Sequence, residues 1–191
     1  MKKIVKILLW IVGVLGVLLL VFNFILWPIL QKQTKKSSPE KNVTYSRGEM
    51  KLDLFYCSPS KKDREIFGAL VPYNEVWRTG ANEPSTFTTN KDLMIAGQPL
   101  PAGAYTLWTI PNETSWKVIF NDKMYKWGVR FTDQKASRNP AHDVLVVEGK
   151  VSKSLNVVED FSITLTVSYP DTTVLMFAWD KVVVPLEIRQ Q

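Results

Sequence analysis

The sequence contains very little cysteine and histidine, the side chains that usually bind zinc. Its 191 residues include one cysteine, Cys57, and one histidine, His142. A single cysteine excludes an intrachain disulfide and a cysteine-based zinc site, and a single histidine excludes every metal site that needs two imidazoles. We therefore expect no metal site, and the sequence gives no indication of a cofactor.

Acidic side chains are absent from the first 36 residues, which carry six lysines: Lys2, Lys3, Lys6, Lys32, Lys35 and Lys36. In residues 37–191 the other 18 basic residues are balanced by all 18 acidic residues. A protein that binds nucleic acid needs a basic surface on its folded domain, because contacts to phosphates supply most of the affinity. The positive charge lies beside a hydrophobic segment instead, so we expect no nucleic-acid partner.

Residues 7–30 contain no charged side chain, and Asn23 is the only strongly polar one. A helix of this length would measure about 36 Å, which exceeds the roughly 30 Å of a bilayer's hydrocarbon core. Trp10 and Trp27 lie near its ends, where indole side chains favour the membrane interface. The pattern predicts that residues 1–30 form a membrane anchor that contacts the lipid bilayer.

A cleavable signal peptide is the alternative interpretation of this segment. Three lysines precede it, as in a signal peptide, but the apolar stretch of a signal peptide spans only about 7–15 residues and ends at small residues. The stretch in this chain is longer and ends in Leu26-Trp27-Pro28-Ile29-Leu30. Positive charges flank both of its sides, so charge alone leaves its orientation in the membrane open.

Residues 31–42 contain no aliphatic or aromatic side chain and are rich in lysine, serine and glutamine. This composition is typical of a flexible linker. The sequence thus divides into a membrane anchor at 1–30, a linker at 31–42 and one domain at 43–191, a length that suits a single hydrophobic core.

The domain has the hydrophobic pattern of β-strands. Apolar and polar residues alternate through residues 50–57, as in a half-buried strand. Strand patterns recur at 85–90, 92–96, 104–110, 115–120, 143–151, 159–168, 172–179 and 181–188, with a turn predicted at 169–171. This arrangement predicts an all-β fold, an antiparallel, jelly-roll-like β-sandwich preceded by one N-terminal transmembrane helix. Residues 61–80 are predicted to hold a short helix or a long ordered loop.

Two blocks of the domain resemble a known family. The first block reads Ile66-Phe67-Gly68-Ala69-Leu70-Val71-Pro72-Tyr73 and then Val76-Trp77-Arg78-Thr79-Gly80-Ala81-Asn82-Glu83. The second spans residues 97–111, and residues 116–121, Trp127-Gly128 and residues 143–145 continue it. Together they resemble the signature of domain-of-unknown-function family 2911, over a region of roughly residues 45–188.

The resemblance implies a secreted or envelope-associated bacterial β-domain and no particular activity. Members of the family usually carry an N-terminal export signal, which favours a single-pass protein with its N-terminus in the cytoplasm and its domain in the periplasm. One position departs from the family pattern, because Ser58 follows Cys57 where an arginine is common. If that arginine contacts a ligand in the family, this chain would bind differently or not at all.

One loop holds the densest group of side chains that could bind a ligand. Arginine offers a rigid fork of five donors that grips a carboxylate or phosphate at two points. The functional interpretation places Arg78, Asn82 and Glu83 in a polar pocket for a small anionic or hydroxylated ligand, with Tyr73 and Trp77 on the same surface. The structural interpretation pairs Arg78 with Glu83, while Asn82 caps the loop through its own backbone.

Histidine is the residue type that changes its charge near neutral pH, so His142 is the first candidate for an acid or base in catalysis. Ser58, Ser60 or Ser85 could join it in space, but no nucleophile signature such as Gly-x-Ser-x-Gly occurs. An exposed loop histidine is the alternative interpretation. For Cys57 we expect a buried and unreactive thiol.

These observations predict a binding or assembly module of the bacterial cell envelope, whose partner would be an envelope protein, a small molecule or a glycan. The alternatives are an envelope hydrolase with a pocket around Arg78 and Glu83, and a carbohydrate-binding module that stacks sugars on exposed indoles. Trp127 is the best candidate for such an indole, because Trp108 and Trp116 lie in predicted strands and are expected in the core. The lack of a catalytic motif favours binding over catalysis.

Overall fold

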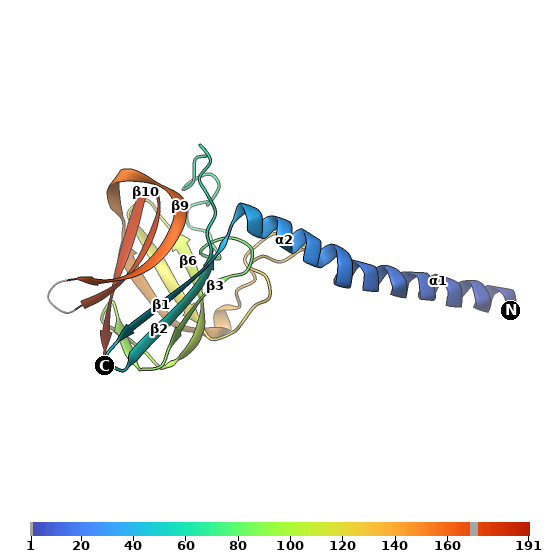
Figure 1. Ribbon diagram of the computed structural model, residues 1–191, viewed down its shortest axis with the longest axis horizontal. Coiled ribbons are helices and arrows are strands. Elements are labelled where there is room, and N and C mark those ends of the chain that lie inside the picture. Colours follow the sequence, from blue (N-terminus) through green and yellow to red (C-terminus); the bar gives the residue numbers. More distant parts are fainter. Residues whose placement is uncertain (1, 169–171) are drawn as a thin grey trace. The chain divides into compact units, whose positions relative to one another are not determined.

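The computed structural model describes residues 2–168 and 172–191 (Figure 1). Two compact units make up the chain, Met1–Ser37 and Ser38–Gln191. The turn predicted at residues 169–171 lies outside the described residues.

The N-terminal unit is one long helical segment. α1 (Lys2–Val21) passes into a π-helix, η1 (Phe22–Leu26), and then into α2 (Trp27–Ser37). Asn23 donates from its Nδ2 atom to the carbonyl oxygen of Leu19 at 2.8 Å. The polar amide thus finds a partner within its own helix, as an apolar solvent requires. The segment is long and apolar enough to cross a membrane, as a signal anchor or a signal sequence does.

The secondary structure of residues 31–42 differs from the predicted flexible linker. α2 continues to Ser37, and β1 (Glu40–Arg47) begins after only two further residues. The polar residues at the start of β1 are strand residues because they pair with β2, with Glu40 opposite Cys57. This pairing depends on a distant partner strand, so the polar composition of residues 31–42 does not indicate it.

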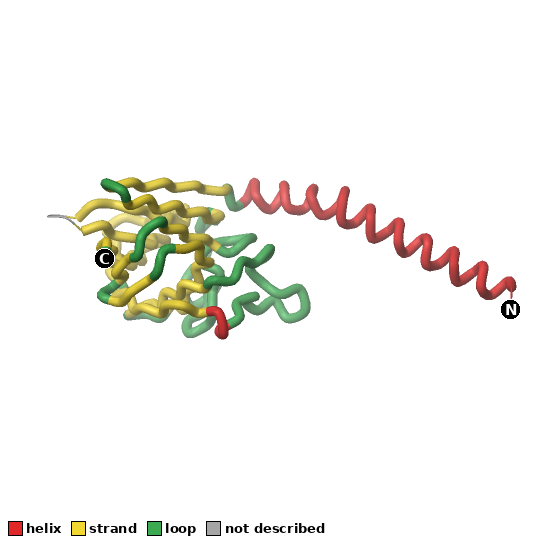
Figure 2. Tube along the Cα trace, turned by 90° about the horizontal axis from the view of Figure 1, so that it is seen from below, coloured by secondary structure: helices red, strands yellow, loops and turns green. Residues whose placement is uncertain are grey.

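The C-terminal unit consists of two antiparallel β-sheets and is sandwich-like (Figure 2). The six-stranded sheet has the order β1-β2-β3-β6-β7-β8, and the four-stranded sheet has the order β5-β4-β10-β9. After β1 the strands are β2 (Met50–Cys57), β3 (Ser85–Thr89), β4 (Leu93–Ile95), β5 (Gln98–Leu100), β6 (Gly103–Pro111), β7 (Ser115–Asn121), β8 (Asp143–Lys150), β9 (Ser152–Ser168) and β10 (Thr172–Gln190). A short 3-10 helix, η2 (Pro140–His142), precedes β8. The unit is therefore mainly β, as the sequence predicts.

The main core lies between the two sheets, because alternate side chains of each strand point inward. β2 buries Met50, Leu52 and Leu54, and β8 buries Leu145 and Val147. Burial of one such large apolar side chain stabilises the fold by about 1.5–3 kcal/mol. The alternation of apolar and polar residues that predicts the strands therefore also predicts which residues form the core.

β9 and β10 are longer than the sequence predicts. β10 is continuous from Thr172 to Gln190, where the hydrophobic pattern predicts two strands, and β9 begins at Ser152 instead of 159. The pairing of β10 with β9 shifts its register on both sides of Asp180, whose φ is 53°. A β-bulge bends a strand without ending it. β10 therefore pairs with β9 in its first part and with β4 in its last part.

The outer face of the six-stranded sheet is covered as well. Trp108 of β6 and Ile119 of β7 lie outside the main core cluster and are nevertheless fully buried. Tyr125 packs edge-on against Trp108, with ring centroids 5.3 Å apart. The loop of residues 122–139 is thus packed onto the sheet, which positions it for the candidate site.

Candidate functional site

The loop with the candidate residues runs along the end of β6. Trp77 and Thr109 exchange two backbone hydrogen bonds, of 2.7 and 3.0 Å. Ser85, the first residue of β3, donates from its hydroxyl to the carbonyl oxygen of Thr79 at 2.5 Å. Residues 61–80 form an ordered loop, which is one of the two structures that the sequence predicts for them.

The backbone of this loop turns sharply at three residues. The φ angles of Thr79, Gly80 and Asn82 are 57°, 146° and 57°. A φ of 146° is accessible mainly to glycine, and a Cβ atom at Gly80 would lie 2.8 Å from the carbonyl oxygen of Cys57. The loop is therefore packed closely against the end of β2.

Trp77 packs against the core and also holds the loop. Its ring stacks on that of Trp179, with centroids 5.9 Å apart and an interplanar angle of 15°, and meets Phe67, Trp116 and Phe161 edge-on. Its Nε1 atom donates to the carbonyl oxygen of Gly80 at 3.0 Å. Trp77 thus joins the aromatic end of the core to the turn of the loop.

Tyr73 is half-buried beside the same core. A Cβ atom at Gly68 would lie 3.0 Å from the Tyr73 ring, so the glycine allows the ring to approach the backbone. Burial raises the pKa of the Tyr73 phenol, because it disfavours the charged phenolate. The Tyr73 phenol therefore loses its proton less readily than an exposed tyrosine.

Arg78 is partly buried, and its Nε atom is buried with no hydrogen-bond partner among the described residues. Burial lowers the pKa of the guanidinium, because removal from water disfavours the charged form. The aliphatic part of the side chain lies over Gly128, where a Cβ atom would come within 2.2 Å of Arg78 Cδ. The ion pairs of residues 2–168 and 172–191 do not include one between Arg78 and Glu83.

Asn82 has a second buried donor in the same loop. The residue is 7 % exposed, and its Nδ2 atom meets no oxygen or nitrogen acceptor in the described part of the chain, although the side chain lies beside the Cys57 thiol. Close by, the thiol of Cys57 donates to Oε2 of Glu83 at 3.6 Å. Buried donors without partners are rare in folded proteins, so their concentration in one loop indicates a place where a ligand could bind.

The Cys57 thiol should make stability depend on pH in the alkaline range. Burial raises the pKa of this thiol from 9.0 to about 11. The folded state therefore holds a proton that the unfolded state loses, and the resulting stability is present below pH 9 and is lost between pH 9 and pH 11. We expect the unfolding free energy of the wild type to fall over this range by up to about 2 kcal/mol more than that of Cys57→Ala.

Urea titrations of the full chain at several pH values, followed by tryptophan fluorescence, would measure this difference. Tyrosines also titrate near the top of the range, but they do so in both proteins. Parallel curves for the wild type and Cys57→Ala would contradict the raised thiol pKa.

Arg78 lines a groove of about 810 Å³ between residues 70–78 and residues 129–140. Its apolar lining includes the side chains of Leu70, Val71, Val76 and Val129. The second wall is attached to the candidate loop, because Gly128 donates its backbone N–H to the carbonyl oxygen of Asn82 at 3.0 Å. The groove is therefore lined by apolar side chains together with charged side chains of both signs, including Glu75, Asp133 and Lys135.

The two arginines of the second wall are already paired. Arg130 contacts both carboxylate oxygens of Asp133, at 3.0 and 2.6 Å, and holds the pKa of Asp133 below its usual range. Arg138 likewise contacts both carboxylate oxygens of Asp143. Asp143 also accepts a hydrogen bond from Asn121 at 2.8 Å. These pairs fix the shape of the wall and neutralise its arginines.

His142 lies in η2, where its Nδ1 atom is 2.8 Å from Oδ1 of Asp122 and both side chains are about half exposed. The three candidate serines donate to other groups, Ser58 to a backbone carbonyl, Ser60 to a carboxylate and Ser85 to the site loop. In the described ranges no three side chains of the types His, Cys, Asp and Glu lie together so as to hold a metal ion.

Sequence reasoning did not identify the second wall of the groove. Gly128 could have been noticed, because Trp127-Gly128 belongs to the family-like pattern and a glycine often marks a close approach of two chain segments. Residues 129–140 carry no motif, and their role depends on folding back over the site. Their contribution therefore becomes visible only in three dimensions.

The sequence was also compared with known proteins. Residues 38–188 match the family described as "Protein of unknown function (DUF2911)". The match spans nearly all of the C-terminal unit and confirms the resemblance noted from the two sequence blocks. Comparisons with curated proteins and with solved structures found no match.

Proposed function

The chain belongs to the DUF2911 family, and on this premise we propose that it is a membrane-anchored binding module whose groove takes a small ligand with a carboxylate or phosphate group. In this proposal the N-terminus lies in the cytoplasm and the C-terminal unit lies outside it, in the cell envelope. The apolar N-terminal helix supports the anchoring, and the export signals usual among family members support the orientation.

Arg78 is the observation that carries the proposal. Three arginines line the groove, and Arg130 and Arg138 are paired with carboxylates. The Nε atom of Arg78, in contrast, is buried and has no hydrogen-bond partner among the described residues. An arginine held out of water without an anion is costly, and a carboxylate or phosphate would offset this cost by charge-assisted hydrogen bonds.

Two further observations favour this ligand over the alternatives. The aromatic neighbours of Trp77 pack around its ring, which makes it a poor platform for stacking a sugar. Trp127, the indole expected to be exposed, is partly buried. His142 is oriented by Asp122 on the surface, while each of the candidate serines donates to another group. A groove that binds an anion without hydrolysing it is the simplest use of these side chains.

The test compares the wild type with Arg78→Met as full chains in uncharged detergent micelles. Inorganic phosphate and citrate serve as probes, against sodium chloride at equal ionic strength. A ligand at ten times its Kd should raise the melting temperature of the wild type by about 3–6 °C. Loss of one charge-assisted contact should weaken binding by about 10- to 100-fold, so at the same ligand concentration Arg78→Met should lose about 70 % or more of this shift.

Arg189→Met is the matched control. Arg189 is an exposed arginine near the turn between β1 and β2, and its removal changes the net charge by the same amount. This variant should keep the full shift. An equal shift in Arg78→Met, or no shift with either probe in the wild type, would overturn the proposed function.

A further inference from the structure

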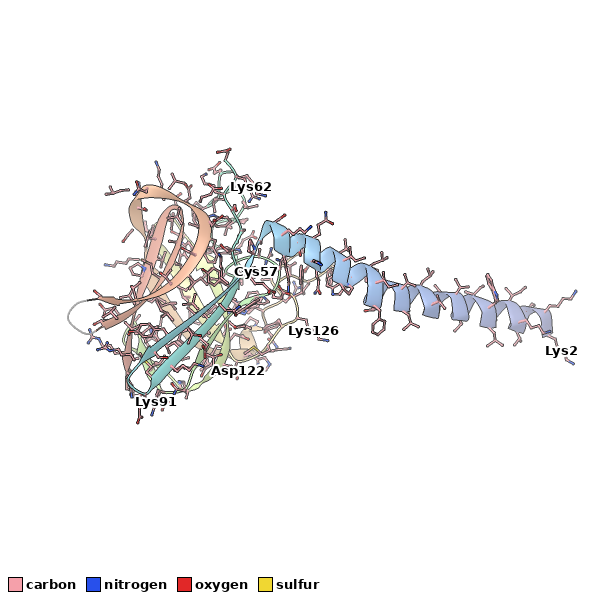
Figure 3. All side chains as sticks on the ribbon, in the orientation of Figure 1. Lys2, Cys57, Lys62, Lys91, Asp122 and Lys126 are labelled. Atoms are coloured by element: carbon pink, nitrogen blue, oxygen red, sulfur yellow. The ribbon has the colours of Figure 1, made fainter. Side chains whose placement is uncertain are left out.

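The groove lies at the end of the C-terminal unit from which the chain runs to the N-terminal helix. Pro39 accepts a backbone hydrogen bond from Ser58 at 2.8 Å, and Glu40 pairs with Cys57. The loop of Arg78 packs against Cys57 through Gly80. Figure 3 labels Cys57 at this end of β2 and Lys91, which pairs with Glu49, at the opposite end.

The connection between the helix and the first strand is short. Only two residues separate Ser37, the last residue of α2, from Glu40, the first residue of β1. A fully extended chain covers at most about 11 Å over these three steps. In a protein anchored by its N-terminal helix, the first strand of the C-terminal unit therefore follows the anchor directly along the chain.

The lining of the groove suits a ligand that is apolar as well as anionic. Val71, Val76 and Val129 line it beside Arg78, and Leu70 is 46 % exposed at the same site. A free phosphate or carboxylate would use only the arginine. An acyl chain on the ligand would also cover the apolar side chains, which stabilises the complex in proportion to the area buried.

The loop that forms the second wall is basic and carries an exposed apolar side chain. Residues 122–139 contain five basic and two acidic residues, in a domain whose charges balance as a whole. Arg130 and Arg138 are paired with carboxylates, and Lys123, Lys126 and Lys135 are the other basic residues of the loop. Met124 in this loop is 50 % exposed, and Figure 3 labels Asp122 and Lys126 in the same loop. A surface with basic and apolar side chains is suited to binding anionic lipid. The negative headgroups attract the basic side chains, and the acyl region accommodates the apolar ones.

We propose that the ligand of the groove is an anionic membrane lipid, with its headgroup phosphate at Arg78 and the start of its acyl chains against the apolar lining. This inference rests on the proposed function of Arg78 and adds the source of the anion. A soluble phosphate ester would share the headgroup chemistry but would lack the apolar contacts, so the two sources can be distinguished.

The test uses the full chain in nanodiscs of phosphatidylcholine, with or without phosphatidylglycerol, and measures amide hydrogen exchange in residues 70–78 and 129–138. Glycerol phosphate added to pure phosphatidylcholine discs is the soluble probe. We expect phosphatidylglycerol to slow exchange in both segments by about fivefold or more. Glycerol phosphate at millimolar concentration should have a smaller effect, Arg78→Met should abolish the lipid effect, and Arg189→Met should keep it.

The other outcomes separate the two proposals. Equal protection by glycerol phosphate would leave the anion-binding function intact and overturn the lipid inference. Two other results would also overturn the lipid inference. One is equal protection from exchange in discs with and without phosphatidylglycerol, and the other is protection that survives in Arg78→Met. Absence of protection by both probes would overturn the lipid inference and the proposed function together.

Discussion

Replacement of Trp77 by alanine should lower the free energy of unfolding by about 3–5 kcal/mol, the range for loss of a large aromatic side chain from a core. Trp77 packs against four aromatic neighbours, stacking on Trp179, and its Nε1 atom donates to the carbonyl oxygen of Gly80. Alanine would leave a cavity at this end of the core and a carbonyl without its donor. Urea unfolding of the full chain in uncharged micelles measures the effect.

Trp77→Phe separates the two contributions of the side chain. Phenylalanine keeps a ring among the aromatic neighbours and removes only the indole N–H, so we expect a smaller loss of about 1–2 kcal/mol. A loss below about 1 kcal/mol in Trp77→Ala would mean that the aromatic contacts do not stabilise the loop. In that case contacts other than those of Trp77 would have to hold Arg78 in place.

Replacement of Gly80 by alanine should destabilise the protein by about 3 kcal/mol, because it combines backbone strain with a steric clash. The φ of Gly80 is 146°, and a Cβ atom would lie 2.8 Å from the carbonyl oxygen of Cys57. Relief of the clash would move the loop away from β2 and carry Arg78 with it. The protection of the groove from amide hydrogen exchange by anionic lipid should therefore fall together with the unfolding free energy.

Gly97→Ala provides the control for this substitution. Gly97 also has a positive φ, of 79°, but no atom lies within 4 Å of a Cβ atom built there. Its replacement should cost only about 1 kcal/mol, the strain of a left-handed alanine. Equal losses at both glycines would show that the contact with Cys57 is unimportant.

Local patterns in the sequence predict most of the strands, and the exceptions have a common cause. β2 has the predicted bounds of 50–57, because its alternation reflects one buried face. β1 and β5 are absent from the prediction: β1 begins with polar residues at an outer edge, and β5 contains Pro99 at the edge of the other sheet. Edge strands tolerate polar residues and proline, so hydrophobic periodicity does not detect them.

Only part of the candidate site can be predicted from a local stretch of sequence. Arg78, Asn82 and Glu83 come from one block of sequence, and the composition of that block was enough to select them. Their surroundings come from elsewhere in the chain, such as the approach of Gly128 to the Arg78 side chain. Such an approach depends on how the loop of residues 122–139 packs over the outer face of the sheet, which no local pattern indicates.

The burial of Cys57 makes the protein convenient for mapping its arrangement across a membrane. The only native thiol is hidden and almost fully protonated at neutral pH, so it barely competes for maleimide reagents. A cysteine introduced in place of Lys62 in the C-terminal unit, or of Lys2 in the N-terminal helix, would be the one reactive thiol of the chain (Figure 3). Labelling of intact cells with a reagent that does not cross membranes would then report which end of the protein faces outward.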